Sequence, residues 1–184
     1  MRDGRVARAK NPNVGDGPGP RGVSKLDPEK LLSALKDHGV EFVIIGGFSL
    51  AAHGVVRATK DVDIVPEPSP ANLKRLARAL RSMGAEPDIG ALDQKELGVE
   101  PDAHGLTMGG NWVLRTKHGR LDVMQNIPGL RSWHQLRAGA VDFDGALYAG
   151  YNELISMKSA SARDEDLTDI ARLKAARGEG EHPN

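Results

Sequence analysis

The sequence predicts an α+β domain in which helices flank a mixed β-sheet and a pair of helices follows at the C-terminal end. The hydrophobic patterns run in the order helix, strand, helix, strand, helix, two antiparallel strand pairs and two helices. The regular alternation of strands and helices that builds a doubly wound parallel sheet is absent. A length of 184 residues, with 39% hydrophobic and 27% charged residues, suits one globular domain with a single core.

The chain divides into four expected segments. The sheet and its helices occupy residues 25–150, and two C-terminal helices at residues 151–177 pack on them. Residues 1–24 are rich in Gly, Pro, Arg and Asn without an apolar period, which predicts a disordered, mildly basic tail. Such a tail has either no function or a loose contact with a phosphate-rich partner. Residues 178–184 are polar and predict a frayed end.

The first expected elements are a helix, a buried strand and a second, short helix. Asp27 is an N-cap with Pro28 at the first helical position, and Gly39 ends the helix. The apolar stripe of this helix comprises Leu31, Leu32 and Leu35. The β-branched run EFVIIG predicts a buried strand, and FSLAAHG predicts a short helix that ends at Gly54.

A second strand and a longer helix follow. Pro66 stops the strand KDVDIVP, and Ser69 caps the helix SPANLKRLARALRSMG. The inward side of that helix carries Leu73, Leu76, Ala77 and Leu80. Its outward side is basic and carries Lys74, Arg75, Arg78 and Arg81. This basic side is either an ordinary solvated helix surface or a track for a phosphate backbone.

The second half of the chain is expected to form two hairpins and two helices. Residues 84–110 lack a clean period and predict a long loop or a small irregular excursion. The stretch NWVLRTKHGRLDVMQNI predicts a hairpin that turns at residues 117–119, and VDFDGALYAG predicts a shorter one with an Asp-Gly turn. The pattern then becomes helical, first in YNELISMKSASA and then in DEDLTDIARLKAAR.

Composition excludes several classes of function. The absence of cysteine excludes disulfides, thiolate catalysis and zinc–thiolate sites. No apolar stretch approaches the roughly 20 residues that a membrane helix needs, and the N-terminus has no apolar signal region, so we expect a cytoplasmic protein without a membrane partner. The formal net charge is zero, so no global charge points to nucleic acid.

Two carboxylates lie inside an apolar strand pattern, where aspartate is disfavoured. Asp61 and Asp63 are two residues apart, so they project from the same face of the strand, roughly 7 Å apart along it. Their mutual repulsion beside a low-dielectric core would raise a pKa. A divalent cation between them removes the conflict, and hard oxygen ligands favour Mg²⁺ or Mn²⁺.

A third carboxylate occupies the same setting on a later strand. Asp122 lies between Leu121 and Val123 in GRLDVMQ. If that strand lies beside the first, three acids converge, as a two-metal phosphoryl-transfer site requires. The alternative is that these aspartates are solvent-facing strand positions, which alternation places somewhere on every half-buried sheet.

The glycine pair Gly46–Gly47 follows a strand and opens a helix. Backbone N–H groups at such a turn can cradle a phosphate, and the Ser49 hydroxyl could add to the cradle. A tight turn explains the glycines equally well.

These features together resemble a known signature. The stretch IIGGFSLAAHGVVRATKDVDIV is similar to that of the DNA polymerase β-like nucleotidyltransferase superfamily: apolar strand, Gly-Gly, about a dozen residues, then Asp-x-Asp. Within it, the chain resembles the small bacterial group that includes AbiEii- and MenT-type toxins of toxin–antitoxin systems. HGVVRATKDVD and LISMKSASARDEDLTDIARL carry this narrower resemblance, which spans roughly residues 27–175.

The resemblance implies a nucleotidyltransferase-like fold and a role for each matching residue. Asp61 and Asp63 would hold both metal ions, and Asp122 would bind one and help to deprotonate the acceptor hydroxyl. A nucleoside triphosphate (NTP) would be the substrate. Its phosphates would be gripped by Gly46, Gly47, Ser49, Arg57, Thr59 and Lys158.

For some of these residues a structural role competes with the functional one. Lys158 ends an apolar helix face, where a flexible cation suits a phosphate, although a solvated helix-end lysine has the same pattern. Arg57 would touch either a phosphate or an acid of the site. The accessory residues of the resemblance could instead be a cap, exposed charges or an ion pair that fixes the two helices: Arg163, Asp166 and Asp169. We expect packing roles for His53, Trp112 and Trp133.

The expected acceptor follows from the narrower resemblance. A toxin of this group would add a nucleotide to the 3′ end of tRNA, and a cognate antitoxin would be its partner. The alternatives are a nucleotidyltransferase that modifies a protein hydroxyl by AMPylation, an antitoxin-type enzyme, an enzyme that modifies a small molecule such as an aminoglycoside, and a non-catalytic binding module.

Overall fold

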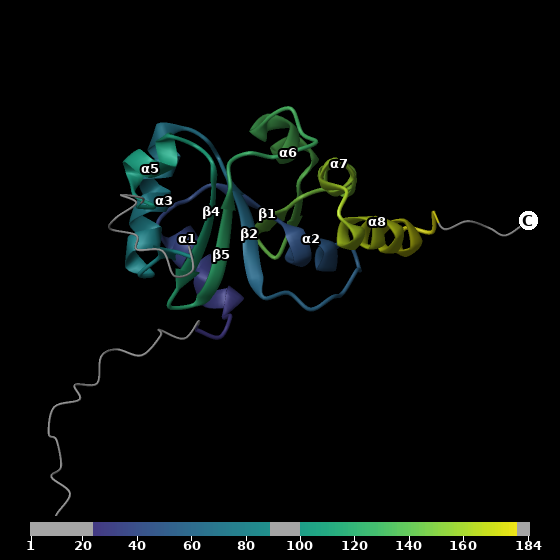
Figure 1. The fold of residues 1–184 in the computed structure, drawn as a ribbon, viewed down its shortest axis with the longest axis horizontal. Coiled ribbons are helices and arrows are strands. Elements are labelled where there is room, and N and C mark those ends of the chain that lie inside the picture. Colours follow the sequence, from purple (N-terminus) through teal and green to yellow (C-terminus); the bar gives the residue numbers. More distant parts are fainter. Residues whose placement is uncertain (1–23, 89–99, 180–184) are drawn as a thin grey trace, which may run out of the picture.

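A computed structural model describes residues 24–88 and 100–179 of the chain. Of the two expected tails, residues 1–23 and 180–184 lie outside the described residues. The described part forms a sheet with helices on both faces, and the two C-terminal helices lie beside each other at one side of it (Figure 1). The α+β class with a C-terminal helical pair is therefore confirmed.

The sheet has seven strands in the order β3-β4-β5-β2-β1-β7-β6. Its centre is the antiparallel pair β1 and β2, and β5 lies parallel to β2 on the other side. The hairpins β4–β5 and β6–β7 are antiparallel, while β7 runs parallel to β1, so the sheet is mixed. The strands are Phe42–Ile45 (β1), Asp61–Pro66 (β2), Glu86–Pro87 (β3), Asn111–Thr116 (β4), Gly119–Met124 (β5), Val141–Phe143 (β6) and Ala146–Tyr148 (β7).

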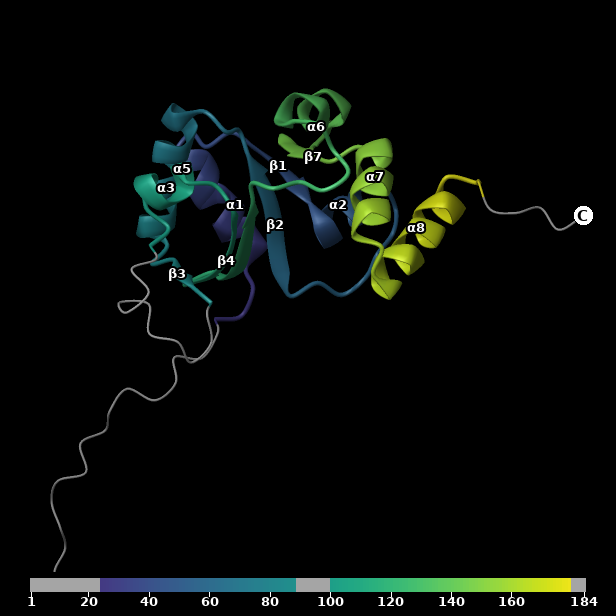
Figure 2. The same ribbon diagram turned by 45° about the horizontal axis from the view of Figure 1, so that its top comes forward.

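Helices cover each face of the sheet with its own hydrophobic core. One face packs on Pro28–Asp37 (α1), Pro70–Ser82 (α3) and Ala103–Thr107 (α5). The other packs on Gly46–Ala52 (α2), Trp133–Gly139 (α6), Tyr151–Ser161 (α7) and Asp164–Ala176 (α8). Figures 1 and 2 show the two groups on opposite sides of β1 and β2. Successive side chains of each strand point alternately toward these two faces.

The alternation along β2 decides where the acids point. Val62 and Ile64 are fully buried in the core under α1 and α3. Val65 packs in the opposite core, beneath α2 and α7. Asp61 and Asp63 therefore face the side of the sheet that carries α2, α7 and α8.

Several local predictions are confirmed in detail. The Asp27 carboxylate accepts a hydrogen bond from the Lys30 N–H, and the Ser69 hydroxyl accepts one from the Asn72 N–H, so both side chains cap their helices. Pro28 and Pro70 occupy first-turn positions. Both predicted hairpins form, with Asp144 and Gly145 at the turn of the second.

Other elements differ from expectation. In the described part of the stretch at residues 84–110, β3 pairs with β4 and Asp102 caps α5, while residues 89–99 lie outside the described residues. Ser132 caps α6, a helix that the sequence pattern did not predict. The short second helix begins at Gly46, so the glycine pair is its first turn. Among the described residues, no helix is both long and apolar enough to cross a membrane.

Candidate active site

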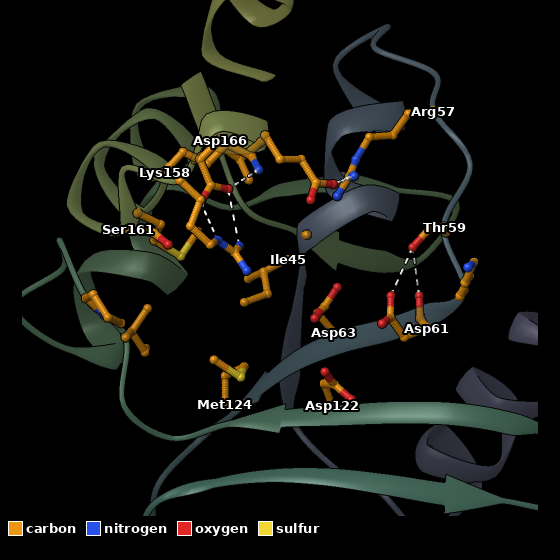
Figure 3. A pocket seen from close by; sticks show the side chains of 18 of the residues that line it. Ile45, Arg57, Thr59, Asp61, Asp63, Asp122, Met124, Lys158, Ser161 and Asp166 are labelled. Carbon is orange, nitrogen blue, oxygen red and sulfur yellow. Dashed lines mark hydrogen bonds and ion pairs between the residues drawn. The ribbon is translucent and has the colours of Figure 1, made fainter. Parts of the chain in front are cut away.

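Strand register brings the three predicted carboxylates to one place. In the parallel pair β2–β5, Asp63 lies opposite Asp122, and Asp61 lies opposite Arg120. All three aspartates line one cavity of about 670 Å³, which is bounded on its other side by α7 and the start of α8. Figure 3 shows Asp61, Asp63 and Asp122 on neighbouring strands, with Lys158 and Asp166 across the cavity. The prediction that Asp122 joins the Asp61–Asp63 pair is confirmed.

The electrostatics of this acidic wall are unfavourable in the protein alone. Burial raises the pKa of Asp63 to about 6, and repulsion from Asp61 and Asp122 adds to the rise. Burial also raises the pKa of Asp122, against the attraction of the Arg120 guanidinium. The carboxylates are therefore placed where their charge is costly, and the fold does not fully neutralise them.

Three residues fit closely around the acids: Thr59 just before β2, and Gly46 and Gly47 at the start of α2. The Thr59 hydroxyl lies 3.1 Å from both Asp61 Oδ1 and the Asp61 carbonyl oxygen, and this contact orients the carboxylate. Gly46 has a positive φ of 62°, and a Cβ there would collide with the Asp63 carboxylate. A Cβ at Gly47 would lie 2.9 Å from the Thr59 side chain. The glycine pair thus lets α2 start directly against the acidic strand.

Ser49 does not reach the cavity. Its side chain is fully buried, and its hydroxyl donates a hydrogen bond of 3.0 Å to the Ala149 carbonyl oxygen. The expected phosphate contact of Ser49 is corrected on this ground, because its hydroxyl is held in the core by the Ala149 carbonyl and the residue is absent from the cavity lining. His53 lies 2.9 Å from the same carbonyl through Nε2, which agrees with its expected packing role.

A buried ionic cluster forms the opposite wall. Lys158 Nζ lies 3.0 Å from Asp166 Oδ1 and 2.6 Å from Asp169 Oδ2, and all three side chains are at least nine-tenths buried. The alternatives of a solvated Lys158 and an exposed Asp166 are therefore wrong. Arg163 Nε bonds Asp166 Oδ2 at 2.7 Å. The tie between α7 and α8 is thus made by Lys158, while Arg163 supports Asp166 from the α8 N-cap.

Arg57 also contacts α8. Its guanidinium pairs with Glu165 and lies 3.6 Å from Asp169 Oδ2. Of the two roles expected for Arg57, the structure shows a contact with acids, although these acids belong to α8 and are not the three aspartates of β2 and β5. Arg57 and Lys158 are both close enough to lower the pKa of Asp63. The cavity therefore has an acidic wall and a cationic wall that face each other.

Sequence reasoning missed Arg120 and Glu165. Arg120 Nε lies 3.3 Å from Asp122 Oδ1 and 3.9 Å from Asp61 Oδ2, so this guanidinium contacts two of the three acids. The signal was available, because Arg120 precedes Asp122 by two residues on one strand and must share its face. Glu165 gave no comparable signal, since its contact with Arg57 depends on how α8 packs.

The remaining lining of the cavity is apolar. Ile45 on β1 and Met124 on β5 line it beside the acids, and Leu154 and Met157 line it from α7. Trp112 and Trp133 are partly buried against the two cores and are absent from this lining, as expected for packing residues.

Several solved structures share the fold of this chain. LnuA, a lincosamide antibiotic adenylyltransferase with lincomycin bound, matches with a TM-score of 0.54 and 12% identity, over 83% of this chain and 99% of its own. ANT(2″)-Ia in complex with adenylyl-2″-tobramycin matches with a TM-score of 0.52 and 11% identity, over 82% of this chain and 87% of its own. A solution structure of ANT(2″)-Ia, an antibiotic-resistance factor, matches with a TM-score of 0.50 and 12% identity, over 82% of this chain and 82% of its own.

The chain has the nucleotidyltransferase fold. No protein-family profile matches the sequence, and no curated protein sequence matches it either. At 11–12% identity the likeness establishes the fold alone. The resemblance seen in the signature residues is therefore confirmed at the level of fold, and the narrower resemblance to AbiEii- and MenT-type toxins stays a prediction.

The donor set of this nucleotidyltransferase fold suits a hard divalent cation. Three carboxylates face one cavity, and the raised pKa values of Asp63 and Asp122 show negative charge that the protein leaves in excess. Within residues 24–88 and 100–179, no group of three or more His, Cys, Asp or Glu side chains is already arranged as a metal cage. Arg120 contacts carboxylate oxygens of Asp61 and Asp122. The residue types of the three acids fit Mg²⁺ or Mn²⁺.

Proposed function

We propose that the chain is a metal-dependent nucleotidyltransferase that moves a nucleoside monophosphate from an NTP to a hydroxyl acceptor. The observation that carries the proposal is the β2–β5 register, which places Asp122 beside Asp63 with Asp61 on the same cavity wall. Three convergent carboxylates on one side and cations on the other are the requirements of phosphoryl transfer. The nucleotidyltransferase fold of the chain supports this choice of reaction.

In the proposed reaction the acceptor oxygen forms a bond to the α-phosphorus, and the bond from that phosphorus to pyrophosphate breaks. Asp61, Asp63 and Asp122 would hold Mg²⁺ or Mn²⁺, which supplies neutralisation of the phosphate charge when bound. Asp122 accepts the proton of the acceptor hydroxyl, a role that its raised pKa favours. Thr59 holds the Asp61 carboxylate in orientation.

The phosphates of the NTP are assigned to the groups that face the acids. Lys158 has three N–H donors, of which Asp166 and Asp169 take two, so one is left for a phosphate oxygen. Gly46 exposes backbone to the cavity, and Gly47 lets it approach β2 closely. Arg57 lines the same space. Asp166 and Asp169 then act as accessory residues that keep Lys158 charged and in place.

For the acceptor we propose the 3′ end of tRNA, with a toxin role and a cognate antitoxin, because the signature segments resemble that group. A second candidate is a small-molecule hydroxyl. It is favoured by the structural likeness to ANT(2″)-Ia, whose structure holds adenylylated tobramycin, and to LnuA, whose structure holds lincomycin. The cavity of about 670 Å³ is open to solvent and is large enough for either a terminal nucleotide or an antibiotic ring beside the phosphates.

A set of parallel incubations tests both the reaction and the acceptor. The purified chain is mixed with Mg²⁺ and each labelled NTP in turn, in separate reactions with total tRNA, cell protein extract, tobramycin or lincomycin. Label should enter one class of acceptor, and Asp61→Ala and Asp63→Ala should reduce incorporation by at least a hundredfold. Asp37→Ala, an exposed change on α1 at the far face of the sheet, is the matched control and should leave the rate intact.

The acceptor arms separate the candidates. Label in tRNA supports the proposed toxin role, label in an antibiotic supports the second candidate, and label in protein supports AMPylation. Undiminished incorporation by Asp61→Ala and Asp63→Ala would refute the active site itself.

A further inference from the structure

Arg120 lies at the centre of the acidic wall. Its strand position is opposite Asp61, and it shares a strand face with Asp122. The Nε atom lies 3.3 Å from Asp122 Oδ1 and 3.9 Å from Asp61 Oδ2. Its side chain is 36% exposed, so the guanidinium has room to move.

A fourth carboxylate offers Arg120 a second position. Asp88, just after β3, lies 3.9 Å from Arg120 through Oδ2 and Nη1. Asp88 is outside the lining of the cavity, and its other oxygen lies 3.5 Å from Arg115 Nε. Arg120 therefore stands between an inner pair of acids that face the cavity and an outer acid that does not.

The inner contacts of Arg120 conflict with the proposed metal ion. A divalent cation needs the oxygens of Asp61 and Asp122, and Arg120 is within ion-pair distance of one oxygen on each. Two cations on the same carboxylates repel each other strongly at such short range. A metal ion and the Arg120 guanidinium therefore compete for the same carboxylate oxygens of Asp61 and Asp122.

We propose that Arg120 is a positioning residue that acts as an internal counter-ion. It holds Asp61 and Asp122 in the metal-free protein, competes with the divalent cation for them, and withdraws toward Asp88 when the cation binds. The proposal rests on the proposed function, because it assumes that the three acids bind a divalent cation.

The first test measures Mn²⁺ binding to the full chain without nucleotide, by the loss of the free-ion signal in electron paramagnetic resonance. Arg120→Gln should bind Mn²⁺ roughly fivefold more tightly than wild type, the equivalent of about 1 kcal/mol at 25 °C. Arg120→Lys keeps the charge and should stay within about twofold of wild type. Lys60→Gln removes an exposed positive charge from the same cavity lining and serves as the matched control, with a change below about twofold.

The second test uses Asp88. Asp88→Asn removes the outer partner, so Arg120 should hold the inner acids more firmly, and Mn²⁺ binding should weaken about twofold. The same change in an Arg120→Gln background should have no effect, because the residue that Asp88 attracts is gone. A simple long-range effect of the Asp88 charge on the metal would instead persist in that background.

The outcomes distinguish the inference from the proposed function. If wild type binds Mn²⁺ and Arg120→Gln binds it equally or more weakly, the counter-ion role is overturned while the metal site stands. If Asp88→Asn acts equally in both backgrounds, the exchange of Arg120 between the acids is overturned. If neither wild type nor Arg120→Gln binds Mn²⁺, the divalent site is refuted, and the role of Arg120 is refuted with it. Circular dichroism spectra that match wild type establish that each variant is folded.

Discussion

Asp63 lies in the sheet between Ile45 on β1 and Asp122 on β5, so its carboxylate is removed from water and placed beside another acid. Its pKa rises to about 6, mainly through burial, and the attraction of Arg57 and Lys158 only reduces the rise. Within the described part of the chain, the Asp63 side chain has no hydrogen-bond partner, in contrast to the Asp61 carboxylate, which Thr59 holds. Asp63 is therefore the acid that the fold accommodates least well.

The stability of the metal-free protein should depend on pH through Asp63. Because its pKa is about 6 when folded and near the ordinary 3.8 when unfolded, the folded state binds more protons between these values. The free energy of unfolding should therefore fall as pH rises from about 4 to about 6. Asp63→Asn has no charge to lose, so at pH 7.5 it should be more stable than wild type by about 1–2 kcal/mol, allowing for solvent that still reaches the carboxylate.

Urea unfolding in EDTA at pH 4, 6 and 7.5 measures this difference. The advantage of Asp63→Asn should shrink toward pH 4, where Asp63 is largely protonated in the folded wild type. Asp37→Asn, at an exposed position of α1, should show no such trend. A variant that is less stable than wild type at pH 7.5 would contradict the assignment of Asp63 as a strained, uncompensated charge.

At the scale of elements, α7 and α8 are joined by charge as well as by apolar packing. Leu154 and Leu173 place both helices on the core under α2. Beside that contact, Lys158 bridges Asp166 and Asp169 in a buried setting. Burial alone would raise the pKa of Asp166, but hydrogen bonds from Arg163 and Lys158 outweigh it and lower that pKa far below its ordinary value. The cationic wall of the cavity is therefore part of the helix–helix joint.

Lys158→Met should destabilise the protein by about 3 kcal/mol, because it leaves two buried carboxylates without the cation between them. Arg163 and Arg57 still reach one acid each, which keeps the loss at the lower end of the range for a broken buried pair. Lys174→Met, an exposed change on α8, is the matched control and should cost less than about 0.5 kcal/mol. Urea unfolding measures both, and a loss below about 1 kcal/mol for Lys158→Met would show that the ionic cluster does not hold the helices.

Elements with strong local signals could be predicted from the sequence, and those defined by distant partners could not. The caps Asp27 and Ser69 and the Asp-Gly hairpin turn are local, and each forms as expected. Strand β3 has only two residues and exists because β4 lies beside it. Helices α5 and α6, with five and seven residues, are too short for a clear apolar period.

The same division applies to the candidate site. Asp61 and Asp63 share a strand face by a rule of local geometry, and the apolar strand setting of Asp122 marked it as the third acid. The burial of Ser49 depends on the Ala149 carbonyl, a hundred residues away in sequence. The ion pairs of Lys158 with Asp166 and Asp169 depend on how α7 and α8 pack against each other. The contact between Asp88 and Arg120 depends on the order of the strands. Contacts of this kind are properties of the fold, which periodicity alone does not encode.

At the scale of the whole molecule, the sheet separates the cavity from the basic side of α3. The acids face the core that lies under α2, α7 and α8, whereas Leu73 and Leu76 anchor α3 in the core on the opposite face. The exposed outer side of α3 carries Lys74, Arg78 and Arg81. These cations therefore point away from the proposed site of transfer, and an RNA acceptor would have to wrap around the sheet to touch both.

The combined change of Lys74, Arg78 and Arg81 to Gln should therefore leave transfer to tRNA within about twofold of wild type, provided that tRNA is the acceptor. The measurement is kcat/KM with labelled NTP and tRNA at several salt concentrations, because each lost phosphate contact lowers the slope of log affinity against log salt by about 0.7–0.9. An unchanged slope means that the acceptor end enters the cavity without help from α3. A slope reduced by two or more would show that the RNA body reaches around the sheet, and the basic side would then be a phosphate track instead of an ordinary solvated surface.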